Sequence, residues 1–418
     1  MAVPKLRFKA DDGSDYPELT VAKLDDLCEK IGDGLHGTPI YSQTGNYYFI
    51  NGNNLENGKI IVSSDTPKVN DGVFEKNNKE LNDSTILMSI NGTIGKVAYY
   101  NNEKVILGKS VAYFKVNYKC IKEYCYQLIQ TANVQCQFQK GLTGSTIKNL
   151  GLNTIKNTNV KVPCLAEQQK IAEFLSTVDT VIEKQKETVS AWEERKKGVM
   201  QKLFSQEVRF KADDGSEFPE WEGKNFSDVF ENLNNSTFSR DCLNYEAGNV
   251  KYIHYGDILI KFGFVIDVQS SNVPYVNKDL DCEKYASLSD GDIVIADTAE
   301  DDTAGKAVEI MNTHCRKTIS GLHTIACHPR EKFASKYLGY FMNADIYHNQ
   351  LRPYMQGIKV TSVSKTNISL TKISVPCLAE QQKIADCLSS LDDVIEKQKA
   401  TLAAWEELKK GLLQQMFV

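Results

Sequence analysis

The chain has 418 residues, of which 41% are hydrophobic and 25% charged, a balance typical of a folded protein with two or three domains rather than a disordered one. No apolar run reaches the roughly 18 residues of a membrane-spanning helix, and no apolar leader opens the sequence, so we expect a cytoplasmic protein without a membrane partner. The 11 cysteines form no C-x-x-C pair, which favours reduced thiols over a disulfide framework.

The first motif along the chain is GDGLHG at residues 32–37, which satisfies the G-x-G-x-x-G pattern of dinucleotide-binding loops. That pattern binds phosphate only where a strand enters it and a helix leaves it. Here residues 21–31 have apolar side chains at helical spacing, and Pro39 and the strand-like YYFI follow the glycines. We therefore expect a helix before the glycines and a glycine-rich loop in place of a nucleotide site.

Basic residues gather in two segments, although the net charge of the chain is −5. Residues 104–161 contain nine lysines and one acid, and residues 303–374 contain ten lysines and arginines against three acids. Residues 222–302 carry six basic and sixteen acidic side chains. Two basic segments on either side of an acidic one indicate two anion-binding surfaces, although solvated lysine-rich loops have the same composition.

The densest group of histidines and cysteines comprises His314, Cys315, His323, Cys327 and His328. The spacings match no standard zinc pattern. The alternation in LHTIACH predicts a strand, which sends neighbouring side chains to opposite faces. We expect a packed strand with one exposed histidine and no metal site.

The chain contains two internal repeats. The 43 residues that start at Val162 return from Val375 with 30 positions identical, and LRFKADDGSDYPE at 6–18 returns as VRFKADDGSEFPE at 208–220. Between these copies lie two segments that differ from each other and contain strand-like runs such as KVAYY, KSVAYFKV and DIVIAD. The sequence thus predicts an α+β protein in which two sheet-containing domains are joined by two long helices, as a tandem repeat with pseudo-two-fold symmetry.

Each 43-residue copy predicts one long helix, because its apolar residues alternate three and four apart. About 40 residues make a rod of roughly 60 Å, and Pro163 and Pro376 mark the starts. Gln185 and Gln398 interrupt the apolar seam. Antiparallel coiled-coil pairing would bring the two glutamines face to face and place the variable domains at opposite ends. Parallel pairing would also match the glutamines, but it would place both domains at one end. We expect the antiparallel form. The predicted seam residues are Leu175, Ile182, Gln185, Trp192, Leu388, Ile395, Gln398 and Trp405.

The order of variable domain, helix, variable domain and helix, with VPCLAEQQKIA at both helix starts, resembles the specificity subunit of type I restriction-modification enzymes over essentially the whole length. Motifs of the variable segments match that family too: GDGLHGTP at 32–39, SINGTIGKVA at 89–98, GSTIKNL at 144–150, HYGDI at 254–258, SDGDIVIADTAEDDTAGKA at 289–307 and GIKVTSVSKTNI at 357–368.

The resemblance implies that each variable domain is a target recognition domain that reads one half of a bipartite, asymmetric site on double-stranded DNA. It also implies that the helices dock two modification (methyltransferase) subunits, which use S-adenosylmethionine, and that restriction (motor-nuclease) subunits, which use ATP and Mg²⁺, join them; this chain itself would hold no cofactor. The expected domains are 1–20 with the first RFKADDGS motif, 21–161 as recognition domain 1, 162–204 as helix 1, 205–222 with the second RFKADDGS motif, 223–374 as recognition domain 2 and 375–418 as helix 2.

Resemblance and composition together predict the residues that contact DNA. Lysines would hold phosphates, loop side chains would reach base edges, and the glycines of GDGLHG would let the backbone approach the duplex. The predicted DNA-binding residues are Asp33, Gly34, His36, Thr38, Asn91, Thr93, Lys109, Lys140, Thr143, Ser145 and Lys148 in the first domain, and His254, Lys261, Lys317, His323, Gln356, Lys359 and Thr361 in the second.

We expect no catalytic residue, because the chain lacks an N-P-P-Y-type methyltransferase motif and GTIGK at 92–96 is too short for a P-loop. Two alternatives remain open. One is a Mg²⁺-dependent nuclease that uses Asp297, Glu300, Asp301 and Asp302, although runs of acids are usually solvated turns. The other is a coiled-coil scaffold that binds no nucleic acid, which would have no need of two unlike basic domains.

Overall fold

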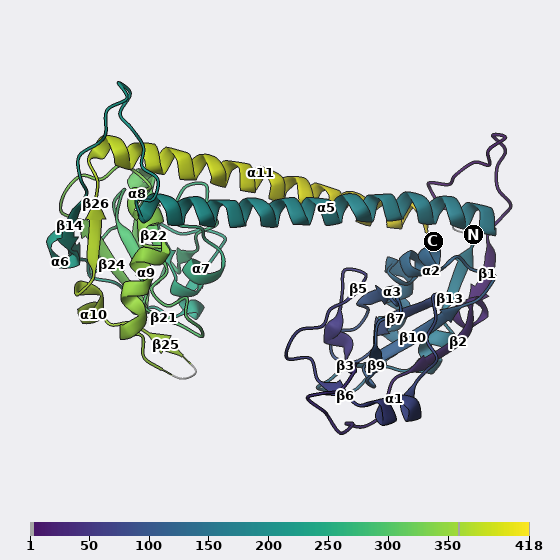
Figure 1. The fold of residues 1–418 in the computed structure, drawn as a ribbon. Helices are drawn as coiled ribbons and strands as arrows, with labels where there is room; N and C mark the ends of the chain where they lie inside the picture. The colour runs from purple at the N-terminus through teal and green to yellow at the C-terminus, as the bar shows by residue number, and fades with distance from the viewer. Residues whose placement is uncertain (1–3, 358–359, 418) are drawn as a thin grey trace. The chain divides into compact units, whose positions relative to one another are not determined.

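The computed structural model describes residues 4–357 and 360–417, which form two compact units (Figure 1). The first unit joins the residues up to Glu187 to those from Ala400 onward, and the second is Thr188–Lys399. Each unit holds one variable segment and one end of each long helix, α5 (Leu165–Phe204) and α11 (Leu378–Met416). The two long helices are confirmed. No helix in the described part of the chain is long and apolar enough to cross a membrane.

Within each unit the ends of the two long helices run antiparallel. The cross-helix ion pairs are Asp179–Lys409 (2.6 Å) and Lys186–Glu406 (2.9 Å) in the first unit, and Glu193–Lys399 (3.0 Å) and Lys196–Asp392 (2.5 Å) in the second. In both units the residue number of the α11 partner falls as the residue number along α5 rises, which confirms the predicted antiparallel arrangement.

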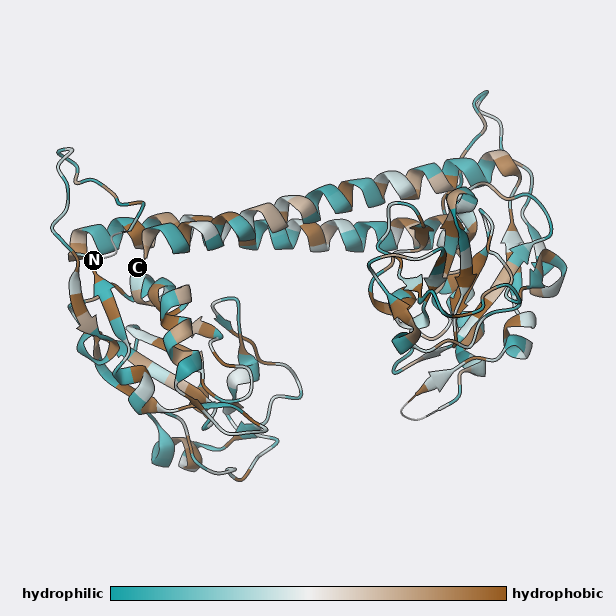
Figure 2. Ribbon diagram, turned by 180° about the vertical axis from the view of Figure 1, so that it is seen from behind, coloured by the Kyte–Doolittle hydropathy of each residue, from teal (hydrophilic) through white to brown (hydrophobic). Residues whose placement is uncertain are grey.

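Apolar and polar residues alternate along both long helices (Figure 2), and the apolar seam stays a prediction. Leu175, Ile182, Leu388 and Ile395 are buried. The other four predicted seam residues, Gln185, Trp192, Gln398 and Trp405, are half-buried. The pairing of Gln185 with Gln398 stays a prediction.

The variable segment of the first unit is built from short strands and helices. Its elements are β1 (Thr20–Lys23), β2 (Cys28–Asp33), β3 (Tyr47–Ile50), β4 (Leu55–Glu56), β5 (Lys59–Ile60), β6 (Lys68–Val69), α1 (Asp71–Asn77), β7 (Thr85–Ser89), β8 (Val97–Tyr99), β9 (Val105–Leu107), β10 (Val111–Val116), α2 (Lys122–Ile129), α3 (Ala132–Lys140), β11 (Leu142–Thr143), β12 (Asn149–Leu150), α4 (Leu152–Lys156) and β13 (Asn159–Val162).

The second unit repeats this plan with additions. Its elements are β14 (Glu222–Asn225), α6 (Phe226–Val229), β15 (Phe230–Asn232), β16 (Leu243–Asn244), β17 (Val250–Ile253), α7 (Tyr255–Ile260), β18 (Val265–Asp267), β19 (Tyr275–Val276), β20 (Ile293–Ala296), β21 (Thr298–Ala299), β22 (Ala307–Met311), β23 (Lys317–Ser320), β24 (Thr324–Pro329), α8 (Tyr337–Phe341), α9 (Asp345–Leu351), β25 (Thr361–Ser362), α10 (Lys365–Ser369) and β26 (Lys372–Val375).

The two variable segments have the same strand arrangement, although their sequences differ. The antiparallel order β2-β10-β7-β8 of the first unit matches β15-β24-β20-β22 of the second, where β18 adds a fifth strand. The order β6-β3-β9 likewise matches β19-β17-β23, and in both the central strand pairs parallel to the later strand. The tandem repeat predicted from the helices therefore extends to the sheets.

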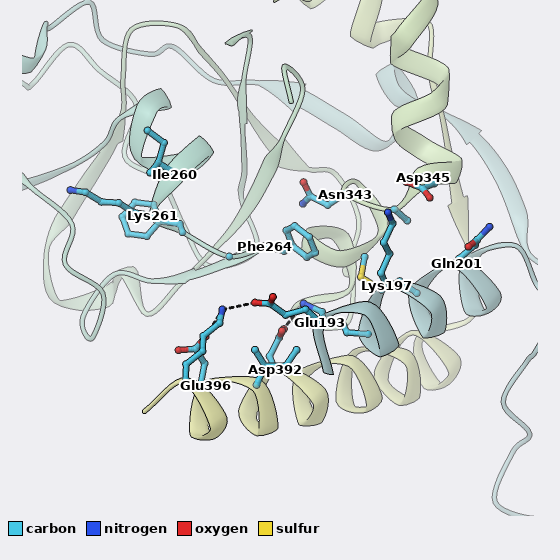
Figure 3. A pocket seen from close by; sticks show the side chains of 17 residues that line it. Glu193, Lys197, Gln201, Ile260, Lys261, Phe264, Asn343, Asp345, Asp392 and Glu396 are labelled. Atoms are coloured by element: carbon cyan, nitrogen blue, oxygen red, sulfur yellow. Dashed lines mark hydrogen bonds and ion pairs between the residues drawn. The ribbon is translucent and has the colours of Figure 1, made fainter. Parts of the chain in front are cut away.

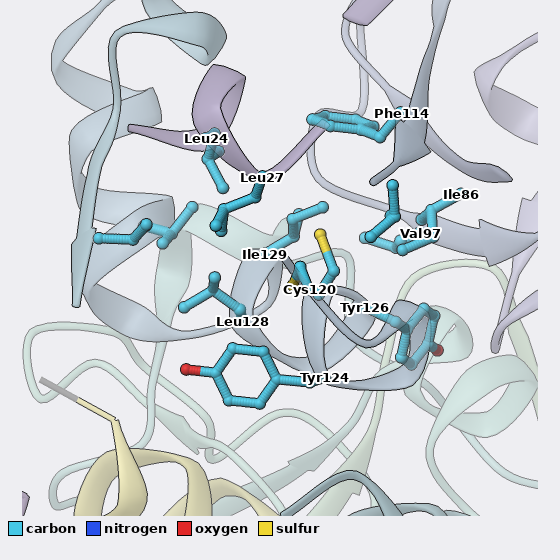
Figure 4. Close-up of a cluster of buried hydrophobic side chains, with 14 of the residues drawn as sticks. Leu24, Leu27, Ile86, Val97, Phe114, Cys120, Tyr124, Tyr126, Leu128 and Ile129 are labelled. Carbon is cyan, nitrogen blue, oxygen red and sulfur yellow. The ribbon is translucent and has the colours of Figure 1, made fainter. Parts of the chain in front are cut away.

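The core of the first unit lies between its antiparallel sheet, α2 and the ends of the long helices (Figure 4). Leu24, Phe114 and Tyr124 are buried there together with the α11 end, where Phe417 stacks on Tyr124 at 5.4 Å between ring centroids. In the second unit Phe204, which ends α5, meets the rings of Tyr337 and Phe341 on α8 edge to face. A phenylalanine thus completes each domain core, Phe204 as the last residue of α5 and Phe417 directly after α11.

The helix expected over residues 21–31 is wrong, because the segment forms β1, a 3₁₀ turn at Leu24–Leu27 and then β2. Along β2 the pairing moves from Lys30 opposite Lys115 to Cys28 opposite Val116, which leaves Glu29 as the extra residue of a β-bulge. The bulge turns Cys28 and Ile31, three apart, toward the same core. A turn and a bulge thus produce an apolar spacing that resembles a helix.

The two RFKADDGS motifs hold the starts of the long helices. Arg7 donates from Nε and Nη2 to the buried carboxylate of Glu167 (3.0 and 2.5 Å), and Arg209 does the same to buried Glu380 (3.1 and 2.8 Å). Trp221 adds a third donor to Glu380 (2.9 Å). Both glutamates belong to the repeated CLAEQQ sequence, so each motif closes on its own helix start.

Candidate nucleic-acid interface

A cavity of about 300 Å³ in the first unit brings together four of the residues predicted to bind DNA. These are Asp33 at the end of β2, His36 after that strand, Asn91 after β7 and Lys109 between β9 and β10. Asp33 and Nε2 of His36 are 2.7 Å apart, which fixes the imidazole ring. The cavity therefore presents a carboxylate, an imidazole, an amide and an ammonium group, which can bond to base edges and phosphates.

Asn149 is a member of this site that the sequence analysis did not single out. Its Oδ1 accepts from Nδ2 of Asn91 (3.2 Å), and it lines the same cavity. It lies within GSTIKNL at 144–150, the motif that also contains the predicted residues Ser145 and Lys148.

The glycines of GDGLHG serve the fold of the protein. A Cβ on Gly34 would lie 2.2 Å from the carbonyl oxygen of Leu107, and one on Gly32 would lie 2.5 Å from the Tyr113 hydroxyl. Gly34 therefore permits a close approach to the protein's own backbone, and its contact with DNA stays a prediction. Thr38 follows on an exposed stretch, after Gly37 with φ +136°.

An exposed hairpin borders the cavity. Its strands are β11 and β12, and Thr143, Ser145 and Lys148 are exposed on it. Gly144 (φ +90°) allows the tight turn, since a Cβ there would lie 2.3 Å from the Ile147 carbonyl oxygen. The backbone carbonyl of Lys148 accepts from the Gly92 amide (3.1 Å), which holds the hairpin beside the loop that carries exposed Thr93. Lys140 ends α3, directly before the hairpin, and is exposed.

The second unit repeats the backbone bonds of this site with different side chains. In the first unit the Ile90 amide donates to the Ser110 carbonyl (2.9 Å), and in the second the Asp297 amide donates to the His323 carbonyl (3.1 Å). The next bonds match too, since Leu150 donates to the Ile90 carbonyl (2.8 Å) as Val363 does to that of Asp297 (2.8 Å). Asp297 thus stands where the first unit has buried Ile90, and His323 stands in place of Ser110.

His323 is held by its neighbours and is exposed. Its Nδ1 lies 3.5 Å from Asp297 Oδ1, and its ring meets Tyr255 edge to face, with centroids 5.3 Å apart. Thr361 on β25 pairs with Ala299 on β21, and the backbone of exposed Gln356 pairs with that of Ser362 on β25. The predicted residues His323, Gln356 and Thr361 are therefore connected through β21 and β25. Lys359 lies outside the described residues.

The remaining predicted residues of the second domain are placed differently. His254 is buried before α7, where its Nδ1 accepts from the Gly256 amide (3.0 Å), and burial followed by the charge of Arg240 lowers its pKa. We do not propose direct DNA contact for it. Lys261 is exposed and pairs with Asp257 (3.1 Å), and Lys317 lies half-buried on β23.

Arg240 is a surface cation that the sequence analysis missed. Its two terminal nitrogens donate to the two oxygens of buried Asp257 (2.8 Å each), which hold the half-exposed guanidinium in place. Burial alone would raise the pKa of the Asp257 carboxyl, but hydrogen bonds from Arg240 and Lys261 outweigh burial and lower it. Nothing in the spacing of residues 240 and 257 signals this pair.

The acids of DTAEDD point to separate partners. Asp297 faces His323, Asp301 accepts from the Thr303 hydroxyl (2.5 Å), and Asp302 lies 3.8 Å from Arg352. Within residues 4–357 and 360–417, no group of three or more His, Cys, Asp or Glu side chains could hold a metal ion. This arrangement does not favour the nuclease alternative.

Comparisons with known proteins agree in assigning one family. The type I restriction modification DNA specificity domain matches residues 17–190 and 219–404. The putative type I restriction enzyme MjaX specificity subunit of Methanocaldococcus jannaschii is 25% identical over 336 residues, covering 77% of this chain and 73% of that protein. The MjaVIII specificity subunit of the same organism is 25% identical over 366 residues and 83% of each chain. The S subunit structure from M. genitalium is similar in fold, with a TM-score of 0.52, 14% identity and coverage of 100% of this chain and 99% of that one.

Proposed function

Since the chain belongs to the type I restriction-modification DNA specificity family, we propose that its two variable segments, 21–161 and 223–374, are target recognition domains that each read one half of a bipartite DNA site. One observation carries this proposal. The two domains share strand order and local backbone bonds, yet Ile90 and Ser110 in the first are replaced by Asp297 and His323 in the second. A shared scaffold with different side chains at the same place is suited to reading two different sequences.

In the first domain, we assign phosphate contacts to the exposed lysines and base contacts to the cavity. Lys109, Lys140 and Lys148 supply positive charge around the site, which fixes position on the duplex. Asn91 and His36 supply the groups that reach base edges in the major groove. Asp33 engages Nε2 of His36 and leaves Nδ1 for the ligand.

In the second domain, His323 is the central reading residue. Asp297 engages its Nδ1, which leaves Nε2 for a base. Thr361 on β25 and Gln356, which pairs with β25 at Ser362, add hydroxyl and amide groups, and Lys261 and Lys317 add positive charge. Lys359 belongs to the same set by its place in the sequence.

The long helices dock two modification subunits in this proposal. Support comes from exposed side chains that recur in both copies: Gln169, Glu194 and Lys197 on α5 return as Gln382, Glu407 and Lys410 on α11. Two like surfaces fit two copies of one partner. The chain is then a non-catalytic subunit in the cytoplasm, and S-adenosylmethionine, ATP and Mg²⁺ act in the modification and restriction subunits.

A domain swap tests the assignment. Residues 21–161 are replaced by the first domain of another family member, and the sites methylated by the complex with its modification subunits are mapped across a genome. One half of the recognised sequence should change and the other should persist. The matched swap of residues 223–374 should change the opposite half. Changes in both halves from either swap, or binding without sequence preference, would contradict the proposal.

A further inference from the structure

Asp179 joins three elements in the first unit and has no part in the proposed DNA site. It lies on α5, and its Oδ1 accepts from Nζ of Lys409 on α11 (2.6 Å). Its Oδ2 accepts from Nε2 of Gln127 on α2 (2.6 Å). One carboxylate therefore ties both long helices to the variable domain.

Asp392 does the same in the second unit. It lies on α11, and its Oδ1 accepts from Nζ of Lys196 on α5 (2.5 Å), while its Oδ2 accepts from the Tyr340 hydroxyl on α8 (2.6 Å). Lys196 also lies 4.6 Å from the ring centroid of Phe264, so the cation contacts the variable domain as well. Figure 3 shows Asp392 between the two helices and the loop of Phe264.

The two arrangements are copies of each other. Asp392 follows Asp179 by 213 residues and Lys409 follows Lys196 by 213, which is the offset of the helix repeat. The contact on the domain side differs, with an amide in one unit and a phenol in the other. The helices thus offer one carboxylate in each unit, and each unlike domain has its own donor for it.

A cavity lies beside each carboxylate, of about 650 Å³ in the first unit and about 530 Å³ in the second. Its helix side comes from the same repeat positions, among them Ile182, Glu183 and Lys186 in the first unit and Ile395, Glu396 and Lys399 in the second. Where such a cavity remains, the domain lacks close packing on the helices. Beside the cavity, the orientation of the domain on the helices therefore depends on hydrogen bonds and ion pairs, which are directional.

Apolar packing joins each domain to the ends of both long helices, and it includes Leu175 with Phe417 in the first unit and Phe204 with Leu388 in the second. Leu175 and Leu388 are fully buried in the two domain cores and precede Asp179 and Asp392 by four residues, about 6 Å along the helix. Apolar contact is non-directional and tolerates rotation. The carboxylate adds a directional contact about one helical turn beyond Leu175 and Leu388.

On the domain side, the side chains that donate to the two carboxylates are Gln127 and Tyr340. Gln127 is fully buried, and its Oε1 has no hydrogen-bond partner in the described part of the chain, while its Nε2 donates to Asp179. A buried amide oxygen without a hydrogen-bond partner costs free energy. Gln127 therefore destabilises the fold through its oxygen while its nitrogen serves as the donor to Asp179. Burial and the bond to Asp392 raise the pKa of Tyr340, so its hydroxyl remains a donor.

The first domain has an additional polar tie. Lys59 on β5 pairs with Glu183 on α5, whereas the equivalent Glu396 pairs with Lys399 of its own helix (3.6 Å). Loss of the carboxylate contact should therefore matter more in the second unit than in the first.

We propose that Asp179 and Asp392 are positioning residues that fix the orientation of each recognition domain on its helix ends and thereby set the number of unread base pairs between the two half-sites. The inference rests on the proposed function, because only a protein that reads two half-sites has such a spacing to set.

The test uses the full chain in complex with modification subunits and duplexes whose half-sites are separated by the native spacer or by one base pair more or fewer. Asp392→Ala and Tyr340→Phe should recognise the same bases as the wild type. In both variants the ratio of affinity for the native spacer to affinity for the neighbouring spacers should fall about tenfold. Asp179→Ala should lose less. Asp393→Ala, which removes an exposed carboxylate from the next position of α11, is the matched control and should change nothing.

The outcomes separate the two proposals. A wild-type complex without preference for a bipartite site would refute the proposed function itself. If the wild type shows that preference and Tyr340→Phe and Asp392→Ala keep its full spacer discrimination, the positioning role is overturned. Equal loss of binding at every spacer would also overturn it, because that result indicates a structural role alone. Tyr340→Phe removes one hydroxyl and keeps the ring, so a folding failure of Asp392→Ala does not prevent a decision.

Discussion

The first and second recognition domains share their strand order and differ in the side chains placed on it. One backbone hydrogen bond that both domains share joins Ile90 to Ser110 in the first domain and Asp297 to His323 in the second. At the position of Tyr99 on β8, which stacks on Tyr126, the second has the buried carboxylate of Glu309 on β22. Backbone hydrogen bonds do not depend on side-chain identity, so the scaffold persists while the chemistry of the surface and core diverges.

The largest expected effect tests which helix end completes which core. Phe204→Ala should lower the free energy of unfolding of the second unit by about 3–5 kcal/mol, and Phe417→Ala should do so in the first unit. Hydrogen exchange resolved by residue measures each unit separately. Leu408→Ala, at an exposed position of α11, is the control and should leave protection within about 0.5 kcal/mol of wild type. Equal loss in both units from one substitution would contradict the assignment.

A smaller difference should separate the two RFKADDGS motifs. Arg7→Met leaves the buried carboxylate of Glu167 without its cation, which should cost about 3 kcal/mol. Arg209→Met should cost less, because Trp221 still donates to Glu380. Denaturant unfolding of the two variants gives the order. A larger loss for Arg209→Met would show that Trp221 does not compensate.

The smallest effect is a pH dependence confined to the second unit. Burial raises the pKa of Glu309 to about 7 from an ordinary value of 4.5, even though the backbone amides of Lys336 and Gly339 donate to it. Between these values the folded state keeps a proton that the unfolded state has lost, so the free energy of unfolding falls as pH rises from 4.5 to 7. Glu309→Gln should remove up to about 3 kcal/mol of that fall. An unchanged pH profile would show that Glu309 does not titrate in this window.

The sequence was sufficient to predict the long helices, because 43-residue near-copies carry their apolar period twice. It also predicted the strands at Val111–Val116 and Ile293–Ala296. It failed at residues 21–31, where a bulge at Glu29 imitates helical spacing. The pairs Arg240–Asp257 and Asn91–Asn149 were out of reach, since side chains far apart in sequence meet only once the sheets have formed.

The position of Phe417 in the first domain has a consequence for synthesis on the ribosome. Residues 412–417 pack into a core whose other members come from the first half of the chain, so that core is finished only after the second domain has been translated. A nascent chain that stops within the second domain carries a first domain without Phe417 on Tyr124. Premature termination within the second domain therefore exposes part of the first domain's core, which makes the fragment more prone to proteolysis.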